Sequence, residues 1–302
     1  MNAMETGPPK ISVYIPTYNV AQFLPRCMKS LLAQELPADE ILVIDDGSGD
    51  NSAELAAACP GITLIRHTAN KGLAAARNTA VNAARNEFVA SIDADCVAHP
   101  SWLGELAKNM SDPKLAGVGG KLIEGVQDSL ADRWRAVHMP QEWGDSLLRN
   151  PRFLFGCNNL FRKSAVLAAG GYDERWRTNG EDTNLCANLR EKGWDLLYDP
   201  SARATHLRHD TTRSILDTYW RWWRFGVNAY GTGVKLRSVI GHALFVHFRY
   251  NFLEPAEKDF QASRWSLLGF DLLVLGYFPY RDFRLWLDQK SRGCSVQNNG
   301  QQ

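Results

Sequence analysis

The sequence predicts an α/β domain in which a mostly parallel central sheet carries helices on both faces. Strand-like apolar runs alternate with helical segments through about the first 124 residues, and this alternation is typical of parallel sheets. The strands are apolar throughout, as expected when both faces of a sheet are covered. Polar loops follow three of the strands, at the sheet edge where such folds bind their ligands.

The first strand, Ile11–Ile15, is a β-rich apolar run that a proline ends. Pro25 then suits the first turn of a helix. The second strand, Glu40–Ile44, runs directly into Asp45–Asp50, a turn-forming sequence. We therefore expect a polar loop at the carboxyl end of each strand. The loop after the first strand contains Pro16, Thr17, Tyr18 and Asn19.

The third and fourth strands continue the alternation. Ile62–Ile65 is the third strand, and Asn70 caps the alanine-rich helix that follows it, Lys71–Arg85. The fourth strand is Phe88–Ile92, which is again apolar. Another helix and a glycine-rich strand, Leu115–Ile123, complete the alternating part of the chain.

Two carboxylates follow the fourth strand at a spacing of two residues. Asp93 and Asp95 point the same way in an extended chain, with Ala94 between them. Hard oxygen ligands of this kind suit Mg²⁺ or Mn²⁺ that also holds phosphate oxygens. Asp-x-Asp occurs by chance in many loops, so this interpretation depends on its surroundings. The loops at 16–19 and 45–46 also lie at strand ends, and all three converge on one crevice.

Composition and missing motifs disfavour several classes of protein. The net charge of +1 over 302 residues gives no global attraction to nucleic acid. Six cysteines without a Cys-x-x-Cys pair indicate neither a disulfide framework nor a zinc site. No Gly-x-Gly-x-x-Gly follows the first strand, which disfavours a dehydrogenase, and no Walker A sequence is present. A nucleotidyltransferase should have a glycine-rich, basic loop after the first strand, and this loop is also missing.

The sequence also indicates where the protein acts. The cysteine usage favours a reducing cytosol. The first ten residues are polar and lack the apolar core of a signal peptide. The apolar stretch Leu267–Phe278 is interrupted by Asp271 and is too short to span a bilayer. We expect a cytoplasmic protein, with peripheral contact at the inner face of the membrane left open.

Several segments together resemble the family 2 glycosyltransferases, which are inverting enzymes with the GT-A fold. The resemblance extends roughly over residues 11 to 230, and the order and spacing of the segments make it specific. It implies a nucleotide-sugar donor, a divalent metal (Mn²⁺ or Mg²⁺) and direct displacement at the anomeric carbon. It also implies a role in polysaccharide, glycolipid or other cell-surface glycan synthesis, with a glycan, lipid-linked or small-molecule acceptor. The matching segments are Val13–Asn19, Ile41–Asp50, Asn70–Asn78, Ser91–Asp95, Gly156–Glu174 and Glu181–Gly193.

The resemblance assigns a donor site. Tyr18 matches the aromatic residue that lies against the nucleotide base, and a phenol ring offers a flat stacking face. Asp46 matches the acid that accepts a hydrogen bond from the base, which favours a UDP-sugar because uracil has an imide N–H. Lys71 and Arg77 match the segment that neutralises the diphosphate. Core packing of Tyr18, a capped turn at Asp46 and ordinary exposed helix charges remain alternatives. The full donor set is Pro16, Thr17, Tyr18, Asn19, Asp45, Asp46, Lys71, Arg77, Asp93 and Ala94.

The resemblance also assigns metal ligands and a base. Asp95 matches the firmer metal ligand, and Asp93 matches the residue that contacts ribose or the ion. His206 stands where a late histidine contributes to the metal or diphosphate site, although His209 competes for this role. Asp182 matches the catalytic base, and Glu181 is its neighbour. Both acids begin a predicted helix, whose dipole favours ionised carboxylates.

The remaining aromatic and basic residues leave alternatives open. Trp134 and Trp143 could contact the acceptor or pack in a core. Tyr219–Gly226 stands where processive synthases carry Gln-x-x-Arg-Trp, and the absence of that pattern disfavours a processive polymerase. Residues 203–249 have a net charge of +6 and could meet a membrane surface or a phosphate-bearing acceptor, or pack their aromatics inward. The basic residues are Arg203, Arg208, Arg213, Arg221, Arg224, Lys235, Arg237 and Arg249.

We therefore predict four regions: a flexible N-terminus at 1–10, a GT-A domain at 11–235, a helical extension at 236–290 and a disordered tail at 291–302. The predicted activity is metal-dependent sugar transfer with inversion. The alternatives are a non-catalytic nucleotide-sugar-binding protein, which would not need the Glu181–Asp182 pair, and a peripheral membrane-binding module. The latter would not need Asp93 or Asp95.

Overall fold

The computed structural model describes residues 9–176, 179–227 and 236–298. The chain divides into two compact units. The first unit contains the residues up to Gly125 together with Pro140–Arg208, and the second contains Val126–Met139 together with the residues from His209 onward. Residues 209–227 thus belong to the second unit, whereas we expected the first domain to continue to residue 235.

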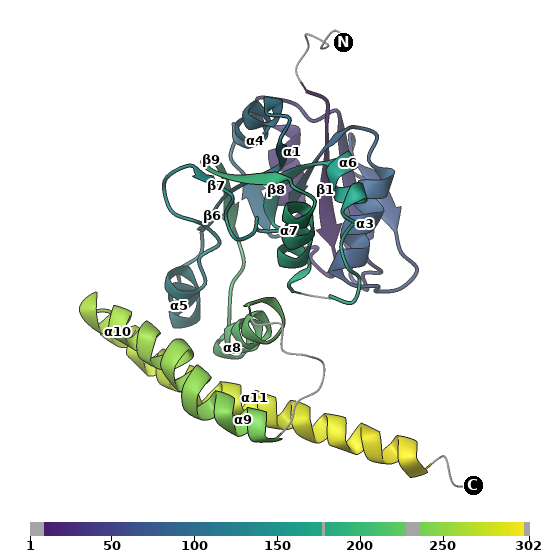
Figure 1. The fold of residues 1–302 in the computed structure, drawn as a ribbon. Helices are drawn as coiled ribbons and strands as arrows, with labels where there is room; N and C mark the ends of the chain where they lie inside the picture. Colours follow the sequence, from purple (N-terminus) through teal and green to yellow (C-terminus); the bar gives the residue numbers. More distant parts are fainter. Residues whose placement is uncertain (1–8, 177–178, 228–235, 299–302) are drawn as a thin grey trace. The chain divides into compact units, whose positions relative to one another are not determined.

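The first unit alternates strands and helices as expected, and its elements are shown in Figure 1. In chain order they are β1 (Ile11–Thr17), α1 (Leu24–Leu32), β2 (Glu40–Asp45), α2 (Ser52–Ala57), β3 (Thr63–Arg66), α3 (Leu73–Ala83), β4 (Phe88–Ile92), β5 (Cys96–Ala98), α4 (Trp102–Ala107), η1 (Lys108–Ser111), β6 (Leu115–Glu124), β7 (Leu148–Arg149), β8 (Asn158–Arg162), α6 (Lys163–Ala168), α7 (Glu181–Glu191) and β9 (Asp195–His206).

The strands form one sheet with the order β3-β2-β1-β4-β8-β6-β9-β5, and β7 pairs with β9. The first four strands in this order are parallel, as the sequence predicts. Beyond them the sheet is mixed, because β8 runs antiparallel between β4 and β6. The carboxyl ends of β1, β2 and β4 therefore lie along the same edge, which is where the predicted site residues are found.

Both faces of the sheet are covered. Side chains of β1 alternate between them: Ile11, Val13 and Ile15 pack with α1 and α4, whereas Tyr14 packs with α3, α6 and α7. Figure 1 shows these two groups of helices on opposite sides of the sheet. The alternation explains why β1 carries apolar side chains on both of its faces, with buried Ser12 bonded to Glu40.

The second unit is helical among its described residues. Its elements are α5 (Leu130–His138), α8 (Thr212–Arg221), η2 (Trp222–Val227), α9 (Leu236–Gly241), η3 (His242–His247), η4 (Arg249–Leu253), α10 (Glu254–Gln261) and α11 (Trp265–Asn298). The last helix extends to Asn298, beyond residue 290 where we expected the helical extension to end. None of the described helices combines the length and the apolar character that crossing a bilayer requires.

Two buried tryptophans in the core of the second unit donate hydrogen bonds to aspartates of α11. Trp134 is fully buried and donates its indole N–H to Asp271 Oδ1 at 2.8 Å. Trp220 makes the equivalent bond to Asp282 Oδ1 at 2.9 Å. Buried indoles need such acceptors, so α11 supplies two buried aspartates to partner them. The acceptor contact considered for Trp134 is therefore wrong, since this residue lies in a core. Tyr219 is buried in the same core.

Candidate active site

Three loops meet at the carboxyl ends of β1, β2 and β4. The backbone N–H of Asp46 donates to the carbonyl of Thr17 at 2.8 Å. The N–H of Asn19 donates to Ser48 Oγ at 3.0 Å, and the N–H of Gly49 donates to Asn19 Oδ1 at 2.8 Å. These bonds join the loop that carries Tyr18 to the loop that follows Asp46. The Tyr18 side chain remains 48% exposed, so the interpretation of Tyr18 as a core residue is wrong.

The carboxylate of Asp46 holds the start of α3. Its Oδ1 accepts the Lys71 N–H at 2.9 Å and contacts His67 Nδ1 at 2.7 Å, while Oδ2 accepts the Gly72 N–H at 2.8 Å. An ionised carboxylate has about four acceptor positions, so the three contacts with described residues leave one position on Oδ2, in an aspartate that is only 3% exposed. Asp45 is also buried, and its Oδ2 pairs with Arg66 Nε at 3.0 Å.

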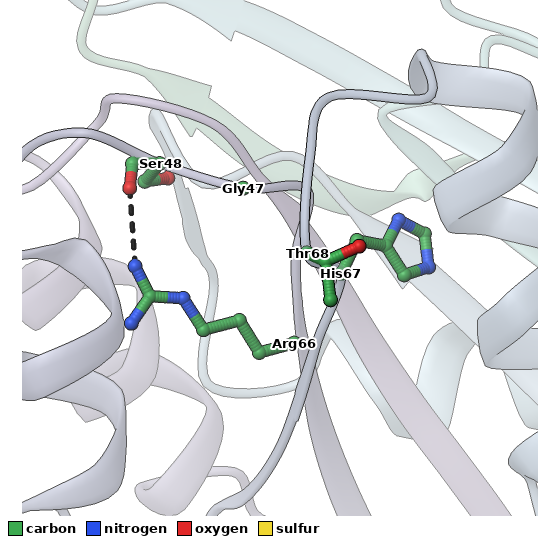
Figure 2. Close-up of a pocket in the computed structure, with 5 residues that line it drawn as sticks. All are labelled: Gly47, Ser48, Arg66, His67 and Thr68. Carbon is green, nitrogen blue, oxygen red and sulfur yellow. Dashed lines mark hydrogen bonds between the residues drawn. The ribbon is translucent and has the colours of Figure 1, made fainter.

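A pocket of about 260 Å³ lies beside these two aspartates. Figure 2 shows Arg66 and His67 extending to opposite sides of the backbone, as neighbouring residues of an extended chain do. Arg66 Nη2 donates to the carbonyl of Ser48 at 3.2 Å, so two of the lining residues are bonded to each other. Two of its lining residues, Arg66 and His67, are the partners of Asp45 and Asp46. Its lining residues are Gly47, Ser48, Arg66, His67 and Thr68.

Arg77 joins the two halves of the site. Its Nη2 lies 3.2 Å from Asp93 Oδ1, and its Nε lies 3.6 Å from Glu181 Oε1. Its Nη1 donates to Ser91 Oγ at 3.0 Å and to the carbonyl of Gly156. Because Arg77 is only 1% exposed, the interpretation as an ordinary exposed helix charge is wrong. Lys71 is exposed, and its contact with a diphosphate stays a prediction.

Glu181 and Asp182 begin α7, as predicted, and they lie in different environments. Glu181 is 3% exposed, and burial together with the charge of Asp182 raises its pKa to about 8 although Arg77 opposes this shift. Asp182 is partly exposed; its Oδ2 accepts the Gly156 N–H at 3.0 Å and its Oδ1 accepts the Thr183 N–H at 2.7 Å. The raised pKa of Glu181 disfavours its ionised form at neutral pH, whereas the Asp182 carboxylate is partly exposed and accepts two backbone N–H groups.

Asp95 and His206 face each other across the proposed metal site. Their Oδ2 and Nε2 atoms are 3.2 Å apart, and Glu124 Oε2 holds the other ring nitrogen of His206 at 2.8 Å. Burial alone would lower the pKa of His206, but the bonds to Asp95 and Glu124 outweigh it and raise the pKa to about 9. The same bond lowers the pKa of Asp95 against the effect of burial.

This arrangement fits a divalent cation. A carboxylate oxygen and an imidazole nitrogen that share a proton can share a metal ion instead, and a second carboxylate on the far ring nitrogen is the usual partner of a metal-binding histidine. Burial raises the pKa of Asp93, and Arg77 offsets this effect only in part. His206 contacts Asp95, whereas His209 is in the second unit, where its side chain is 64% exposed and lies 3.9 Å from Asp132. We therefore keep His206 as the predicted metal residue.

Comparisons with known proteins identify the family of the chain. The family model described as glycosyl transferase family 2 matches residues 12–168, which is more than half of the chain. The chain belongs to this family. It is 32% identical over 204 residues to a pre-mycofactocin glycosyltransferase of Mycobacterium tuberculosis, covering 65% of this chain and 42% of that one. It is 26% identical over 223 residues to a poly-β-1,6-N-acetyl-D-glucosamine synthase of Staphylococcus aureus, covering 70% of this chain and 53% of that one. The chain thus spans about half the length of these curated relatives.

Solved structures share the fold of this family 2 chain. A mannosyltransferase from Pyrobaculum calidifontis, in complex with GDP-Man and Mn²⁺, superimposes with a TM-score of 0.56 at 18% identity over 92% of this chain and 88% of that one. GalNAc-T7 with UDP, GalNAc and Mn²⁺ superimposes with a TM-score of 0.56 at 18% identity, covering 73% of this chain and 49% of that one. TarS of S. aureus superimposes with a TM-score of 0.57 at 15% identity, covering 89% of this chain and 54% of that one. At these identities the likeness confirms the GT-A fold.

Two residues of the candidate site were not predicted from the sequence. Glu124 ends β6 and lies opposite His206 in the β6–β9 register, a pairing between segments far apart in the chain. Gly156 uses its N–H to hold Asp182 and its carbonyl to hold Arg77. A methyl group at Gly156 would lie 2.6 Å from Arg77 Nη2, so only glycine fits. The resemblance covers Gly156, but its contact with a buried arginine is visible only in the structure.

We expect Gly156→Ala to damage the site without removing any functional group. The added methyl must displace the Arg77 guanidinium, and overpacking of this kind costs about 1–3 kcal/mol of stability. Because Arg77 contacts Asp93 and Glu181, transfer activity should fall about 10²-fold. Thermal unfolding and transfer rates would be measured beside Gly104→Ala, a helical position where the methyl has ordinary space. Equal rates for Gly156→Ala and wild type would contradict this account.

Proposed function

We propose that the chain transfers a sugar from a nucleoside-diphosphate donor to an acceptor hydroxyl, with inversion and with a divalent cation. The observation that carries this proposal is the double contact of Arg77. One buried guanidinium reaches Asp93 on the metal side and Glu181 on the base side. The two functions are therefore held within the span of a single side chain, as a reaction between a metal-bound donor and an activated hydroxyl requires.

In the proposed reaction Asp182 accepts the proton of the acceptor hydroxyl while the hydroxyl oxygen bonds to the anomeric carbon. The bond from that carbon to the diphosphate oxygen breaks, and its electron pair leaves with the nucleotide. One displacement inverts the configuration. A divalent cation would supply positive charge for the departing diphosphate, and Asp93, Asp95 and His206 would hold it. The Mn²⁺ in two solved structures of this fold supports a divalent cation, which we propose is Mn²⁺ or Mg²⁺.

We further propose a UDP-sugar donor. The exposed ring of Tyr18 would stack on the base, and the open acceptor position of Asp46 Oδ2 would accept a base N–H. Uracil, thymine and guanine carry such a ring N–H, whereas adenine has none. The two solved structures with nucleotides contain GDP-Man and UDP, so they do not distinguish uracil from guanine. We propose uracil from the resemblance at Asp46. The acceptor would be a hydroxyl of a glycan, a lipid-linked sugar or a small molecule, on the cytoplasmic side of the membrane.

The donor proposal predicts a ranking of nucleotides. With Mn²⁺ present, calorimetry should show UDP binding most tightly, dTDP and GDP less tightly, and ADP most weakly. Tyr18→Ala should weaken UDP binding by about tenfold, because base stacking is worth about 1–3 kcal/mol. Tyr18→Phe keeps the ring and serves as the matched control. Preference for ADP, or unchanged binding by Tyr18→Ala, would overturn the proposed base site.

Hydrolysis of a panel of nucleotide sugars by purified protein would test the reaction itself. It needs no knowledge of the acceptor, since water can replace it slowly. Release of one nucleoside diphosphate with Mn²⁺ or Mg²⁺, and not in EDTA, would support the proposed activity. Absence of both hydrolysis and transfer across broad donor and acceptor panels would favour a binding protein without catalysis.

A further inference from the structure

Helix α11 is apolar on two opposite sides. Leu267, Phe270, Val274 and Phe278 are buried and pack with residues of α5 and α8. Another set of large apolar side chains on α11 is 39–59% exposed and recurs at helical spacing. A helix on a protein surface normally carries polar residues on the side turned away from the core. The exposed set is Trp265, Leu272, Leu273, Tyr280, Phe283 and Leu287.

The helices that precede α11 also expose large apolar side chains. Leu236, Ile240, Leu244 and Phe248 recur every four residues and are 41–62% exposed, and Phe245 is 73% exposed. The segment α9–α10 packs along α11, and His247 Nε2 fixes it there with a 3.0 Å contact to Asp282 Oδ2. Figure 1 shows the two segments running alongside each other. We call residues 236–290 the C-terminal hairpin.

Exposed apolar side chains are concentrated in this hairpin. Of the 20 large apolar residues that are exposed in the described part of the chain, 14 belong to it. By contrast, the aromatic stretch that the sequence singled out packs inward, since Tyr219 and Trp220 are buried. Lys235 lies outside the described residues. The apolar surface therefore begins within the basic segment, at Leu236, and continues beyond its end at Arg249.

The charges of the hairpin point to the occupant of this surface. Asp259, Asp271 and Asp282 are buried. The remaining acids, Glu254, Glu257 and Asp288, are exposed, and so are five cations. A second copy of the chain would bring the same excess of positive charge to the contact, whereas an anionic bilayer attracts it. The five exposed cations are Arg237, Arg249, Lys258, Arg284 and Lys290.

We propose that the C-terminal hairpin is an interfacial anchor that lies on an anionic bilayer surface. Its exposed leucines and phenylalanines enter the boundary between headgroups and acyl chains, while arginine and lysine heads reach the phosphates. Trp265, Tyr250 and Tyr280 have the amphipathic rings that favour this boundary. Helix α11 contains two buried aspartates that accept indole N–H groups. Such residues fit a helix that lies along the bilayer surface better than one that crosses the bilayer.

The test measures binding of the full chain to sedimented vesicles. Vesicles of phosphatidylcholine alone and of phosphatidylcholine with about one-third phosphatidylglycerol would be compared at low and high salt. We expect at least tenfold tighter binding to the anionic vesicles at low salt, and a loss of this preference at high salt. Absence of binding to anionic vesicles at low salt would overturn the proposal.

Two sets of variants separate the apolar from the charged contribution. The triple variant Phe245→Ser, Leu272→Ser, Phe283→Ser should bind anionic vesicles at least tenfold more weakly. The matched control Leu147→Ser, Leu167→Ser removes exposed apolar side chains of the first unit and should bind as wild type. Arg249→Gln, Arg284→Gln should weaken binding to anionic vesicles and reduce its salt dependence. Circular dichroism would verify that each variant is folded.

The oligomeric state decides between the membrane and a second copy. In sedimentation analysis without lipid, wild type and the triple serine variant should have the same oligomeric state. A dimer that forms through the hairpin, disappears in the triple variant and fails to bind vesicles would assign this surface to a second copy of the chain. Equal vesicle binding by the triple variant and wild type would also contradict the proposed anchor.

Discussion

Asp182→Asn should slow sugar transfer by about 10²- to 10⁴-fold, the usual contribution of a positioned base. This corresponds to about 3–5 kcal/mol of transition-state stabilisation. The substitution keeps the size of the side chain and leaves an oxygen that can accept one of the two backbone N–H groups now bonded to Asp182. Donor binding should stay nearly unchanged, because Asp46, Asp93 and Asp95 are untouched.

The control for this variant is Asp173→Asn, the same chemical change at a carboxylate that pairs with exposed Arg175. Transfer rate and donor affinity would be measured for wild type and both variants. Hydrolysis of the donor by water should fall less than transfer, because water is a poor substitute for the acceptor. Transfer by Asp182→Asn at the wild-type rate would show that another group is the base.

The pH dependence of the wild-type enzyme tests the obvious alternative. If Glu181 were the base, the rate would rise as pH passes through its raised pKa of about 8, because a base acts in its ionised form. We assign the proton acceptor to Asp182, so the rate should change little between pH 7 and pH 9 when Mn²⁺ is saturating, a condition that keeps the raised pKa of His206 from limiting metal binding. A steep increase over that range would transfer the role to Glu181.

Much of the first unit could be predicted because its signals are local. The strands β1, β2, β3 and β4 are short, largely apolar runs followed by polar loops, although β1 continues through Pro16 to Thr17, beyond its expected end at Ile15. Parallel strands place these ends at one edge, so Tyr18, Asp46 and Asp95 were expected to converge. The position of β8 between β4 and β6 depends on pairing between distant segments, for which the sequence has no local signal.

The charged residues of the site show the same limit. Arg77 follows three alanines on α3, and nothing in that pattern indicates that its guanidinium is buried. Only the fold brings Asp93, Glu181 and the Gly156 carbonyl to it, and a buried charge is tolerable only with such partners. His206 could be placed by resemblance, but Glu124 could not, because its role follows from the register of β6 against β9.

Asp95→Ala should remove most of the metal-dependent gain in nucleotide affinity. The substitution deletes the carboxylate that faces His206 Nε2 at 3.2 Å. In wild type, Mn²⁺ should strengthen UDP binding, and EDTA should abolish that gain. In the variant, UDP should bind with similar weak affinity with and without Mn²⁺. Transfer should fall by at least 10²-fold, because the cation contributes several kcal/mol to stabilising charge on the departing diphosphate.

A graded series distinguishes loss of a ligand from general damage to the site. Glu124→Gln leaves Asp95 and His206 in place but weakens the hold on the far ring nitrogen of His206, which should cost about 10- to 100-fold in metal affinity. Asp112→Ala, a carboxylate paired with Arg149 away from the site, should bind Mn²⁺ and UDP as wild type. Calorimetry with and without Mn²⁺ would rank the three variants. Equal UDP affinity in Mn²⁺ and in EDTA for wild type would exclude Asp95 and His206 as ligands of a cation that holds the donor.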